Sequence, residues 1–335
     1  MDAQPGALMA AELAEARGVF CRTAAKKVCG TVADELAASR AFYTVARGSS
    51  DAAANILSYV MMDQLGIPVT SLPPSVFSLG QGVDVAQSAA LIVSQSGASD
   101  DLVRSAKGAK SRGAKVVALT NAPGSPVEAA SDLTVPIDAG PELAVPATKT
   151  VIGSIAAGMA LLAAIRLDYA RTVERDCKAM SALGQAGHPA ASAIRASLLR
   201  ARHVYVIGRD TGFGAAQETA LKIKECCALH AESYSASEVL HGPLQLATNP
   251  LMVLILDTGQ ERTQKSLDQA EARFKGVGCD VHRLRVSDVS DQPLSPAGAA
   301  ALLLSLVYPV ILETALALGL NPDAPETLSK VTQTT

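Results

Sequence analysis

An internal repeat is the feature that most constrains the fold of this chain. The segment AFYTVARGSSDAAA begins at Ala41 and matches HVYVIGRDTGFGAA, which begins at His203, at an offset of 162 residues. LIVSQSG, from Leu91, matches VLILDTG at the same offset, and RGAKVVAL resembles VGCDVHRL at an offset of 165, which indicates a three-residue insertion in the second copy. This internal duplication predicts two copies of one arrangement of strands and helices.

Within each copy, short apolar runs alternate with longer helical patterns. The run ALIVSQ lacks polar alternation, as is typical of a strand that is buried on both faces. The pattern predicts an α/β protein of two tandem doubly wound parallel-sheet domains, each a flavodoxin-like or Rossmann-like three-layer sandwich. We expect an N-terminal helix over 1–27, domains over 28–165 and 190–325, a linker over 166–189 and a C-terminal tail over 326–335.

Composition narrows the function classes. The chain has 335 residues, a net charge of -3, 3% aromatic residues and no Trp, so we expect no nucleic-acid partner. Six cysteines without a C-x-x-C pair indicate free thiols in a reducing compartment rather than a zinc site. The apolar runs 151–165 and 296–312 are predicted to be buried helices, because the first is too short to span a membrane and Pro309 interrupts the second. We therefore expect no membrane partner and a cytoplasmic location.

Polar residues end the apolar run at residues 89–93. Ser94, Gln95, Ser96, Gly97 and Ser99 follow it directly, before a helix that is predicted to begin near Asp100. Ligands of doubly wound sheets bind beyond the carboxyl ends of the strands, and a helix N-terminus attracts anions. The segment therefore predicts a phosphate site without lysine. A plain helix N-cap is the alternative, although one hydroxyl would be enough for a cap.

The second copy serves as a comparison for the serine segment. At the constant offset, Ser94 corresponds to Leu256 and Gln95 to Asp257, so a hydroxyl is lost and a repulsive carboxylate is gained. We expect only the first half to bind phosphate, with Ser49 and Ser50 as further hydroxyls at the end of its first strand. A dinucleotide site is not expected, because GRDTGFG lacks the G-x-G-x-x-G spacing.

The segment ALKIKECCALHAESYSASEVLHGPLQL is the richest in groups that can transfer protons. Lys222 and Glu225 are three residues apart and share a helix face, and His241 lies in a turn after a short helix. Two alternatives stay open: Lys222 and Glu225 form a surface ion pair, and His230 is structural.

Four segments, SQSGASDD, ALKIKE, HAESYSASEVLHGP and ETLSKVTQT, together with the repeat, resemble the sugar isomerase (SIS) domain family over nearly the whole chain. The chain is most similar to the isomerase half of glutamine–fructose-6-phosphate amidotransferase and to stand-alone double-SIS glucosamine-6-phosphate deaminases. The resemblance implies that Glu225 is the base that transfers the proton and that Lys222 is its neighbouring lysine. It implies that His241, supplied by a neighbouring subunit, opens the sugar ring, and that Lys330 engages the carbonyl of the open-chain sugar. It also implies a sugar-phosphate pocket made of Ser49, Ser50, Ser94, Gln95, Ser96, Ser99 and Val145.

The resemblance further implies an enzyme, a glucosamine-6-phosphate deaminase/isomerase, that works as a homodimer with a shared site and uses no metal or organic cofactor. The chain begins Met1-Asp2, without the cysteine of a glutaminase, and the repeat starts near residue 30. We therefore expect release of ammonia rather than its production from glutamine. Two positions depart from the family pattern: Ala147 replaces a serine of VASTK, and Asp210 replaces a glycine.

Three alternatives to this reaction remain. The first is a deglycase acting on fructosamine 6-phosphates, and the second is a galactosamine-6-phosphate deaminase/isomerase. The third is a non-catalytic sugar-phosphate sensor, which would not need Glu225, His241 and Lys330 together. The tail around Lys330 is polar, and composition alone would make it a frayed end.

Overall fold

The structure, a computed structural model, describes residues 4–28 and 30–330. These residues form two compact units. The first unit comprises residues 18–142 and 149–178, and the second comprises residues 4–17, 143–148 and 179–330. The short loop 143–148 thus belongs to the second unit, although the residues on either side of it belong to the first.

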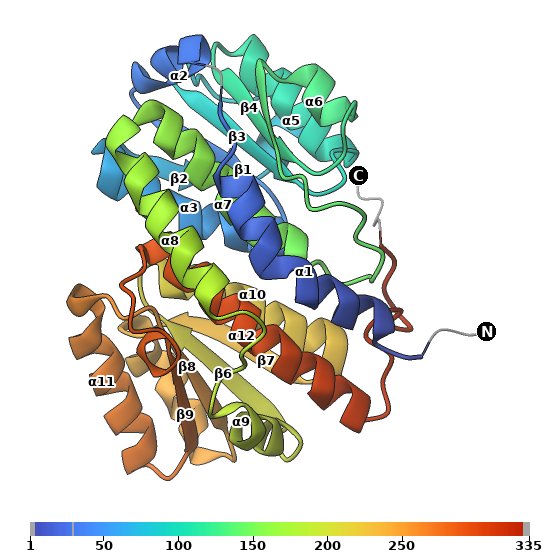
Figure 1. Cartoon of the computed structure of the whole chain (residues 1–335), viewed down its shortest axis with the longest axis vertical. Helices are drawn as coiled ribbons and strands as arrows, with labels where there is room; N and C mark the ends of the chain where they lie inside the picture. The colour runs from blue at the N-terminus through green and yellow to red at the C-terminus, as the bar shows by residue number, and fades with distance from the viewer. Residues whose placement is uncertain (1–3, 29, 331–335) are drawn as a thin grey trace. The chain divides into compact units, whose positions relative to one another are not determined.

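The first unit is built on a parallel five-stranded sheet in the order β2-β1-β3-β4-β5 (Figure 1). Its strands are β1 (Phe42–Val45), β2 (Val69–Ser71), β3 (Ala89–Ser94), β4 (Lys115–Thr120) and β5 (Leu133–Pro136). Its helices are α2 (Gly30–Ala37), α3 (Ser49–Leu65), α4 (Ser75–Ser78), α5 (Asp100–Ser111), α6 (Pro126–Ala130), α7 (Lys149–Ile165), η1 (Leu167–Tyr169) and α8 (Ala170–Ala182). Two helices, α1 (Ala7–Ala24) and α8, contribute residues to both units.

Two apolar layers cover the faces of this sheet. On one face, Leu57 of α3 and Leu161 of α7 pack with strand residues such as Leu91. On the other, Leu102 of α5 packs with Ile92. Every residue of β3 is buried, because neighbouring residues of one strand point into different layers. Helices on both faces explain why the strand shows no polar alternation.

The second unit is built on a parallel four-stranded sheet in the order β7-β6-β8-β9. Its strands are β6 (His203–Gly208), β7 (His230–Ser235), β8 (Met252–Asp257) and β9 (Asp280–Arg285). Its helices are α9 (Ala191–Leu198), α10 (Thr211–Cys227), η2 (Glu238–Leu240), η3 (Gly242–Thr248), α11 (Glu261–Gly276), η4 (Val286–Asp288) and α12 (Pro296–Ala317). The two parallel α/β sheets confirm the predicted fold class, whereas the exact domain boundaries stay a prediction.

The strand ladders correct the repeat alignment. Val45 of β1 pairs with Ile92 of β3, and Ile207 of β6 pairs with Ile255 of β8. The copies are therefore 162 residues apart in the first strand (207 - 45) and 163 apart in the central strand (255 - 92). The constant offset of 162 is therefore wrong by one residue in β8. The second copy has one extra residue before this strand and one residue fewer in the loop after it, so Gly97 and Gly259 are again 162 residues apart.

One described helix, α12, is long and apolar enough to cross a membrane. Of its most apolar 18-residue window, 78% is buried inside the protein, and its neighbours in the second unit are α9 and α10. Pro309 lies within this helix without ending it. The burial agrees with the prediction of a core helix for this run.

Candidate active site

The serine loop, residues 94–99, connects β3 to α5, and its hydroxyls organise its own backbone. The Oγ of Ser94 accepts a hydrogen bond from the Gly97 amide at 3.1 Å, and the Oγ of Ser96 accepts one from the Ala98 amide at 3.3 Å. Ser99 is the N-cap residue of α5, yet its side chain makes no capping hydrogen bond. The N-cap alternative therefore does not account for the Ser99 hydroxyl, and phosphate binding by this loop stays a prediction.

Gly97 is required by the shape of this loop. Its φ of +60° lies in the left-handed region that favours glycine. A Cβ atom at this position would lie 2.2 Å from the Oγ of Ser125 and 2.8 Å from the Oγ1 of Thr120. Only glycine therefore allows the loop to pack this closely against Ser125 and Thr120.

The predicted phosphate-binding hydroxyls lie at one edge of the first sheet. Ser49 and Ser50 open α3 directly after β1, while the serine loop follows β3. β1 and β3 are parallel neighbours, and the strand order reverses between them. Their carboxyl ends therefore form the switch point at which doubly wound sheets bind ligands, with two helix N-termini beside it.

An ion pair spans the two segments of this edge. The guanidinium of Arg47, at the end of β1, lies 3.0 Å from a carboxylate oxygen of Asp101, in the first turn of α5. The Asp101 side chain is only 8% exposed, so its charge would act strongly on an anion beside the serine loop. Arg47 neutralises this charge. The pairing was not predicted from the sequence, because the two residues meet only through the fold.

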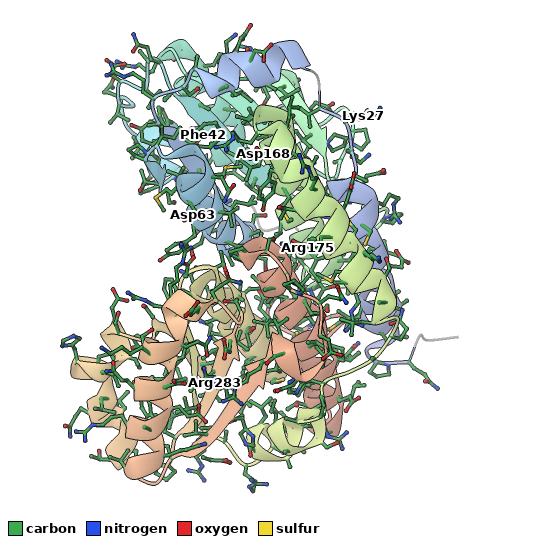
Figure 2. All side chains as sticks on the ribbon, turned by 60° about the vertical axis from the view of Figure 1, so that its left-hand side comes forward. Lys27, Phe42, Asp63, Asp168, Arg175 and Arg283 are labelled. Atoms are coloured by element: carbon green, nitrogen blue, oxygen red, sulfur yellow. The ribbon has the colours of Figure 1, made fainter. Side chains whose placement is uncertain are left out.

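In the second unit a carboxylate replaces the serine hydroxyl. Asp257, the structural counterpart of Ser94, accepts a hydrogen bond from the Gly259 amide at 2.8 Å, as Ser94 does from Gly97. Its other oxygen accepts one from Nε of Arg283 at 3.0 Å (Figure 2 labels Arg283). The predicted carboxylate is therefore present, but it is compensated by an arginine, and it supplies this loop with an anion of its own.

Asp210 keeps the backbone shape of the glycine that it replaces. Gly48 has φ 54° and ψ -130°, and Asp210, at the same place in the second copy, has φ 59° and ψ -132°. Such angles are costly for any residue with a Cβ atom. The Asp210 side chain partly offsets this cost, because it accepts a hydrogen bond from the Thr211 amide and pairs with Arg262 at 2.7 Å.

The acid–base cluster lies on one face of α10. Lys222 is fully buried, and its ammonium donates a hydrogen bond to Glu225 and lies 3.4 Å from Glu218. Burial by itself would lower the pKa of Lys222, but the charges of Glu218 and Glu225 outweigh it and raise that pKa above its ordinary value. The alternative of a surface ion pair between Lys222 and Glu225 is wrong, because the Lys222 side chain is fully buried.

Sequence reasoning missed Glu218. The residues Glu218, Lys222 and Glu225 follow helical spacing, and this spacing was the available signal. Burial could not be read from the sequence, since Glu and Lys are usually exposed.

Glu225 forms part of a cavity wall. The cavity has a volume of about 480 Å³ and is lined by the end of α10 and by residues 319–328 of the C-terminal segment. α10 returns from the carboxyl end of β6 to the amino end of β7, and Glu225 lies in its last turn. The expectation that sites lie at carboxyl strand ends thus fits the serine loop but not Glu225.

The C-terminal segment is held through Lys330. Its ammonium donates a hydrogen bond to the Ala144 carbonyl at 2.6 Å, and the amide of the next residue, Val145, donates one to the Asp323 carbonyl at 3.0 Å. The structure thus brings Lys330 together with Val145, two residues that were predicted from distant parts of the sequence. The frayed-tail alternative does not fit Lys330, while residues 331–335 lie outside the described residues.

His241 lies apart from this cavity. It is exposed between η2 and η3, as predicted for a turn after a short helix, and lines a different cavity with Arg273 of α11. The preceding histidine, His230, is exposed at the start of β7, where its Nδ1 lies 3.4 Å from that of His203. Neither histidine lines the Glu225 cavity.

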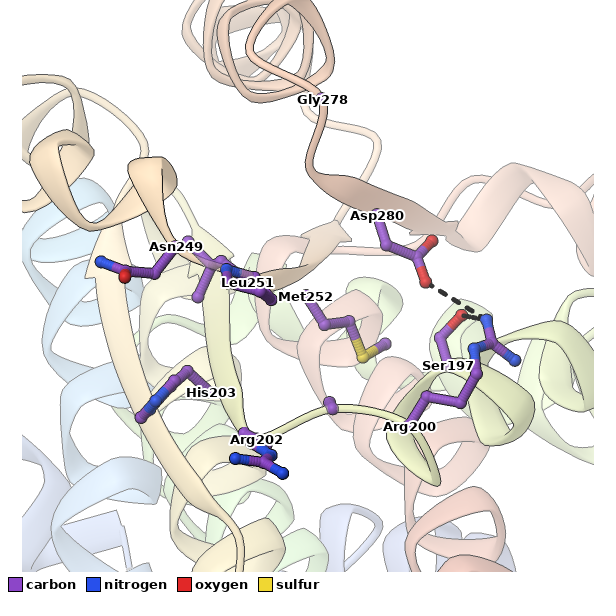
Figure 3. A pocket seen from close by; sticks show the side chains of 11 residues that line it. Ser197, Arg200, Arg202, His203, Asn249, Leu251, Met252, Gly278 and Asp280 are labelled. Atoms are coloured by element: carbon purple, nitrogen blue, oxygen red, sulfur yellow. Dashed lines mark hydrogen bonds and ion pairs between the residues drawn. The ribbon is translucent and has the colours of Figure 1, made fainter.

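A further cavity, of about 500 Å³, lies at the amino end of the second sheet (Figure 3). Arg200 and Asp280, which pair at 3.5 Å, and Met252 are among the residues that line it. It contains none of the predicted site residues. Among the described residues, no group of three His, Cys, Asp or Glu side chains is placed to hold a metal ion.

Comparison with known proteins relates most of this chain to about half of enzymes that are named for fructose 6-phosphate. Glutamine–fructose-6-phosphate aminotransferase (isomerizing) of Pyrobaculum aerophilum is 31% identical over 317 residues, which make up 90% of this chain and 52% of that protein. The enzyme of the same name from Brucella abortus is 29% identical over 308 residues, 84% of this chain and 50% of that protein. The chain spans about half the length of these curated relatives.

Solved structures show the same fold. A protein from Silicibacter pomeroyi, provisionally assigned as a phosphosugar isomerase, superposes with a TM-score of 0.83 at 32% identity, covering 94% of this chain and 99% of that one. Glucosamine-6-phosphate deaminase from Thermotoga maritima superposes with a TM-score of 0.75 at 19% identity, covering 98% and 100% of the two chains.

The model of the SIS domain matches this chain twice, at residues 35–164 and 197–306. The two matches coincide with the two parallel sheets and with the two halves of the sequence repeat. The chain belongs to the SIS domain family and is related to the isomerase domain of glutamine–fructose-6-phosphate aminotransferase and to phosphosugar isomerases.

Proposed function

We propose that this protein is an aminosugar-phosphate deaminase/isomerase that converts glucosamine 6-phosphate and water into fructose 6-phosphate and ammonia. The observation that carries the proposal is Glu225, a carboxylate on a cavity wall that is hydrogen-bonded to the buried ammonium of Lys222. A carboxylate held in this way can move a proton between neighbouring carbon atoms. The serine loop of the first unit supplies the hydroxyls and the helix N-terminus that a phosphate needs.

The reaction begins with the ring-closed substrate, whose phosphate binds at the serine loop and at Ser49 and Ser50. His241 protonates the ring oxygen and opens the sugar. Glu225 then removes the proton from C2, which gives an enolamine, and returns a proton to C1, which leaves an imine at C2. Water adds to this imine, the C2–N bond breaks, and ammonia leaves together with fructose 6-phosphate.

Lys330 binds the open-chain carbonyl in this scheme. Its ammonium already donates a hydrogen bond to a carbonyl oxygen, that of Ala144, so the carbonyl oxygen of an open sugar is a chemically similar partner. A Schiff base with Lys330 is the other possible role. Borohydride in the presence of fructose 6-phosphate separates the two, because only a Schiff base is reduced to a permanent adduct.

The decisive measurement is ammonia release by the purified protein from glucosamine 6-phosphate. We expect turnover with the phosphate ester and little with glucosamine, and we expect Glu225→Gln to lower kcat by about 10²–10⁴-fold while the sugar phosphate still binds. Glu261→Gln, the same exchange at an exposed glutamate of α11, is the matched control and should keep its activity. Equal turnover of glucosamine and its phosphate would contradict the phosphate site. Activity on galactosamine 6-phosphate or on fructosamine 6-phosphates alone would favour the corresponding alternative enzyme.

A shared site between two subunits is part of the proposal, because His241 and Glu225 line different cavities of one chain. Mixing inactive Glu225→Gln and inactive His241→Ala proteins should restore activity, since each hybrid dimer then contains one intact site. The two variants carry affinity tags of different mass, and native mass spectrometry verifies that their subunits have exchanged. Confirmed exchange without any recovery would place both residues in the site of one subunit.

A further inference from the structure

Tyr308 of α12 contacts the acid–base cluster from outside α10. Its side chain is fully buried, and its hydroxyl donates a hydrogen bond of 3.0 Å to Oε1 of Glu218. Glu218 is also fully buried, and α10 and α12 pack along each other in the second unit. A tyrosine hydroxyl that donates to a buried carboxylate stabilises the ionised form of that carboxylate.

Lys222 therefore lies between two carboxylates that differ in surroundings. Glu218 is inaccessible and receives the hydroxyl of Tyr308, whereas the Glu225 side chain is 23% exposed and faces the cavity. Both attract the same ammonium. An ionised Glu218 offsets part of the positive charge that acts on Glu225, and a carboxylate next to a compensated ammonium holds a proton more readily than one next to an uncompensated ammonium.

We propose that Tyr308 is a positioning residue that keeps Glu218 ionised on the far side of Lys222 and thereby preserves the basicity of Glu225. The hydroxyl acts through Glu218 and Lys222 and does not touch the substrate. This inference rests on the proposed function only for its catalytic consequence. The electrostatic coupling from Tyr308 to Glu225 belongs to the second unit alone.

The charged and titratable groups around this relay come from three elements. Within α10 they are Lys222, Glu218, Lys224 and Cys226; α12 supplies Tyr308; and the C-terminal segment supplies Glu326, which lines the cavity beside Glu225. Burial raises the pKa of the Cys226 thiol, so this group stays neutral in the neutral range. Lys224 and Glu326 are exposed, and solvent weakens their influence. Glu218 is then the buried carboxylate that shares the Lys222 ammonium with Glu225.

Removal of the Tyr308 hydroxyl should change the basicity of Glu225 in a predictable direction. In Tyr308→Phe, the buried Glu218 loses a donor and is more readily protonated, so Glu225 faces an ammonium that is less compensated. Glu225 becomes a weaker base, and the acid limb of the kcat profile moves to lower pH. Glu218→Gln removes the charge completely and should produce a larger shift in the same direction. We expect kcat at the pH optimum to fall by about 3–10-fold in Tyr308→Phe, with KM for the sugar phosphate unchanged.

The experiment combines this pH profile with a titration that needs no turnover. In protein labelled with ¹³C at the glutamate carboxyl groups, the Glu225 signal is assigned by its loss in Glu225→Gln, and its titration midpoint is compared among variants. The midpoint should fall in Tyr308→Phe and further in Glu218→Gln, and the double variant should equal Glu218→Gln, because Tyr308 acts only through Glu218. Thr314→Val is the matched control on α12: it removes a buried hydroxyl bonded to the Val310 carbonyl and leaves the midpoint unchanged.

The outcomes separate this proposal from the proposed function. A midpoint in Tyr308→Phe that does not move, or that rises, would overturn the relay even if kcat falls, because a purely structural role lowers kcat without that shift. A lowered midpoint in a protein that releases no ammonia from any aminosugar phosphate would keep the relay and overturn the proposed reaction. Should Tyr308→Phe fail to fold, Glu218→Gln alone tests the same sign.

Discussion

At the scale of single residues, Gly97 links the shape of the serine loop to the phosphate site that we propose there. Gly97→Ala places a methyl group 2.2 Å from Ser125 and also demands a positive φ, so we expect a loss of roughly 1–3 kcal/mol in the free energy of unfolding. Affinity for sugar phosphate should fall as well. Gly124→Ala is the control, because its φ is also positive, at +71°, but the added Cβ meets nothing within 4 Å. Urea unfolding and isothermal calorimetry measure both effects, and equal behaviour of the two variants would remove the steric explanation.

Arg47 offers a second test at this scale, because it neutralises Asp101 beside the serine loop. Arg47→Met leaves the charge of Asp101 uncompensated, and we expect the KM for the sugar phosphate to rise by about tenfold, equivalent to about 1.4 kcal/mol. Adding Asp101→Asn should restore most of the affinity, since the repulsive charge is then gone as well. If the double variant binds no better than Arg47→Met, Arg47 contacts the phosphate directly instead of compensating Asp101.

The sequence predicted the residues of the candidate site where local spacing decides the geometry. Lys222 and Glu225 share a helix face, and the serine loop joins a strand to a helix, so one segment of sequence contains each relation. Tyr308 and Glu218 lie 90 residues apart, and Arg47 and Asp101 lie 54 apart. No local pattern reports such contacts, because they exist only once helices pack on each other or strands pair.

At the scale of elements, α10 contains a buried ammonium whose loss should be costly. Lys222→Met leaves Glu218 and Glu225 without their shared cation, and we expect unfolding at pH 8 to become easier by about 3–5 kcal/mol. The pKa of Lys222 is raised in the folded state, so its stabilisation is complete below the ordinary lysine pKa of about 10.4 and is lost as the pH rises through the higher folded value.

The pH dependence supplies the check on this prediction. Urea midpoints of the wild type and of Lys222→Met should differ most at neutral pH and should converge only above about pH 10.4. Lys224→Met, which removes an exposed lysine from the same helix, should change the free energy of unfolding by less than about 0.5 kcal/mol. A gap between the wild type and Lys222→Met that closes already near pH 7 would show that another group is responsible.

The end of α10 makes a further prediction about thiol chemistry. Burial raises the pKa of Cys226 above its ordinary value and that of Cys227 to about 12, and both side chains are only 2% exposed. Because the thiolate is the reactive form, neither cysteine should react with iodoacetamide at pH 8 in the folded protein. Both should be labelled in urea, as peptide mass spectrometry can determine. Rapid labelling without urea would mean that this part of α10 opens locally.

Element types followed from the sequence more securely than their register. Apolar runs and helical patterns identified parallel strands with helices on both faces, because burial of both sheet faces leaves a clear composition. These patterns could not reveal the one-residue shift of β8 relative to β3. Strand pairing fixes which residue is opposite which, and an aligned pattern of apolar residues is equally good at either offset.

At the scale of the whole molecule, the two units should respond differently to a sugar phosphate. The serine loop lies in the first unit, and Asp257 occupies the corresponding place in the second. Fructose 6-phosphate should therefore slow hydrogen exchange most in the loops after β1 and β3 and should leave the loop after β8 unchanged, because ligands stabilise the segments that they bind. Glucose without phosphate is the control. Equal protection of the loop after β8 would assign it a phosphate site as well.

If the serine loop binds a sugar phosphate as proposed, Asp257 also has a consequence for how long the protein survives when that substrate is scarce. The loop after β8 carries its counter-charge on the chain, in a buried pair with Arg283, whatever the surrounding metabolites are. At the corresponding place the serine loop carries the neutral hydroxyl of Ser94, and we expect its anion to be the phosphate of a bound sugar. Starvation for sugar phosphate would therefore expose one half of the duplication, and only that half, to proteases that cleave locally opened segments. If the proposed phosphate site is correct, the duplication gives one half whose lifetime depends on metabolite supply and one half whose lifetime does not.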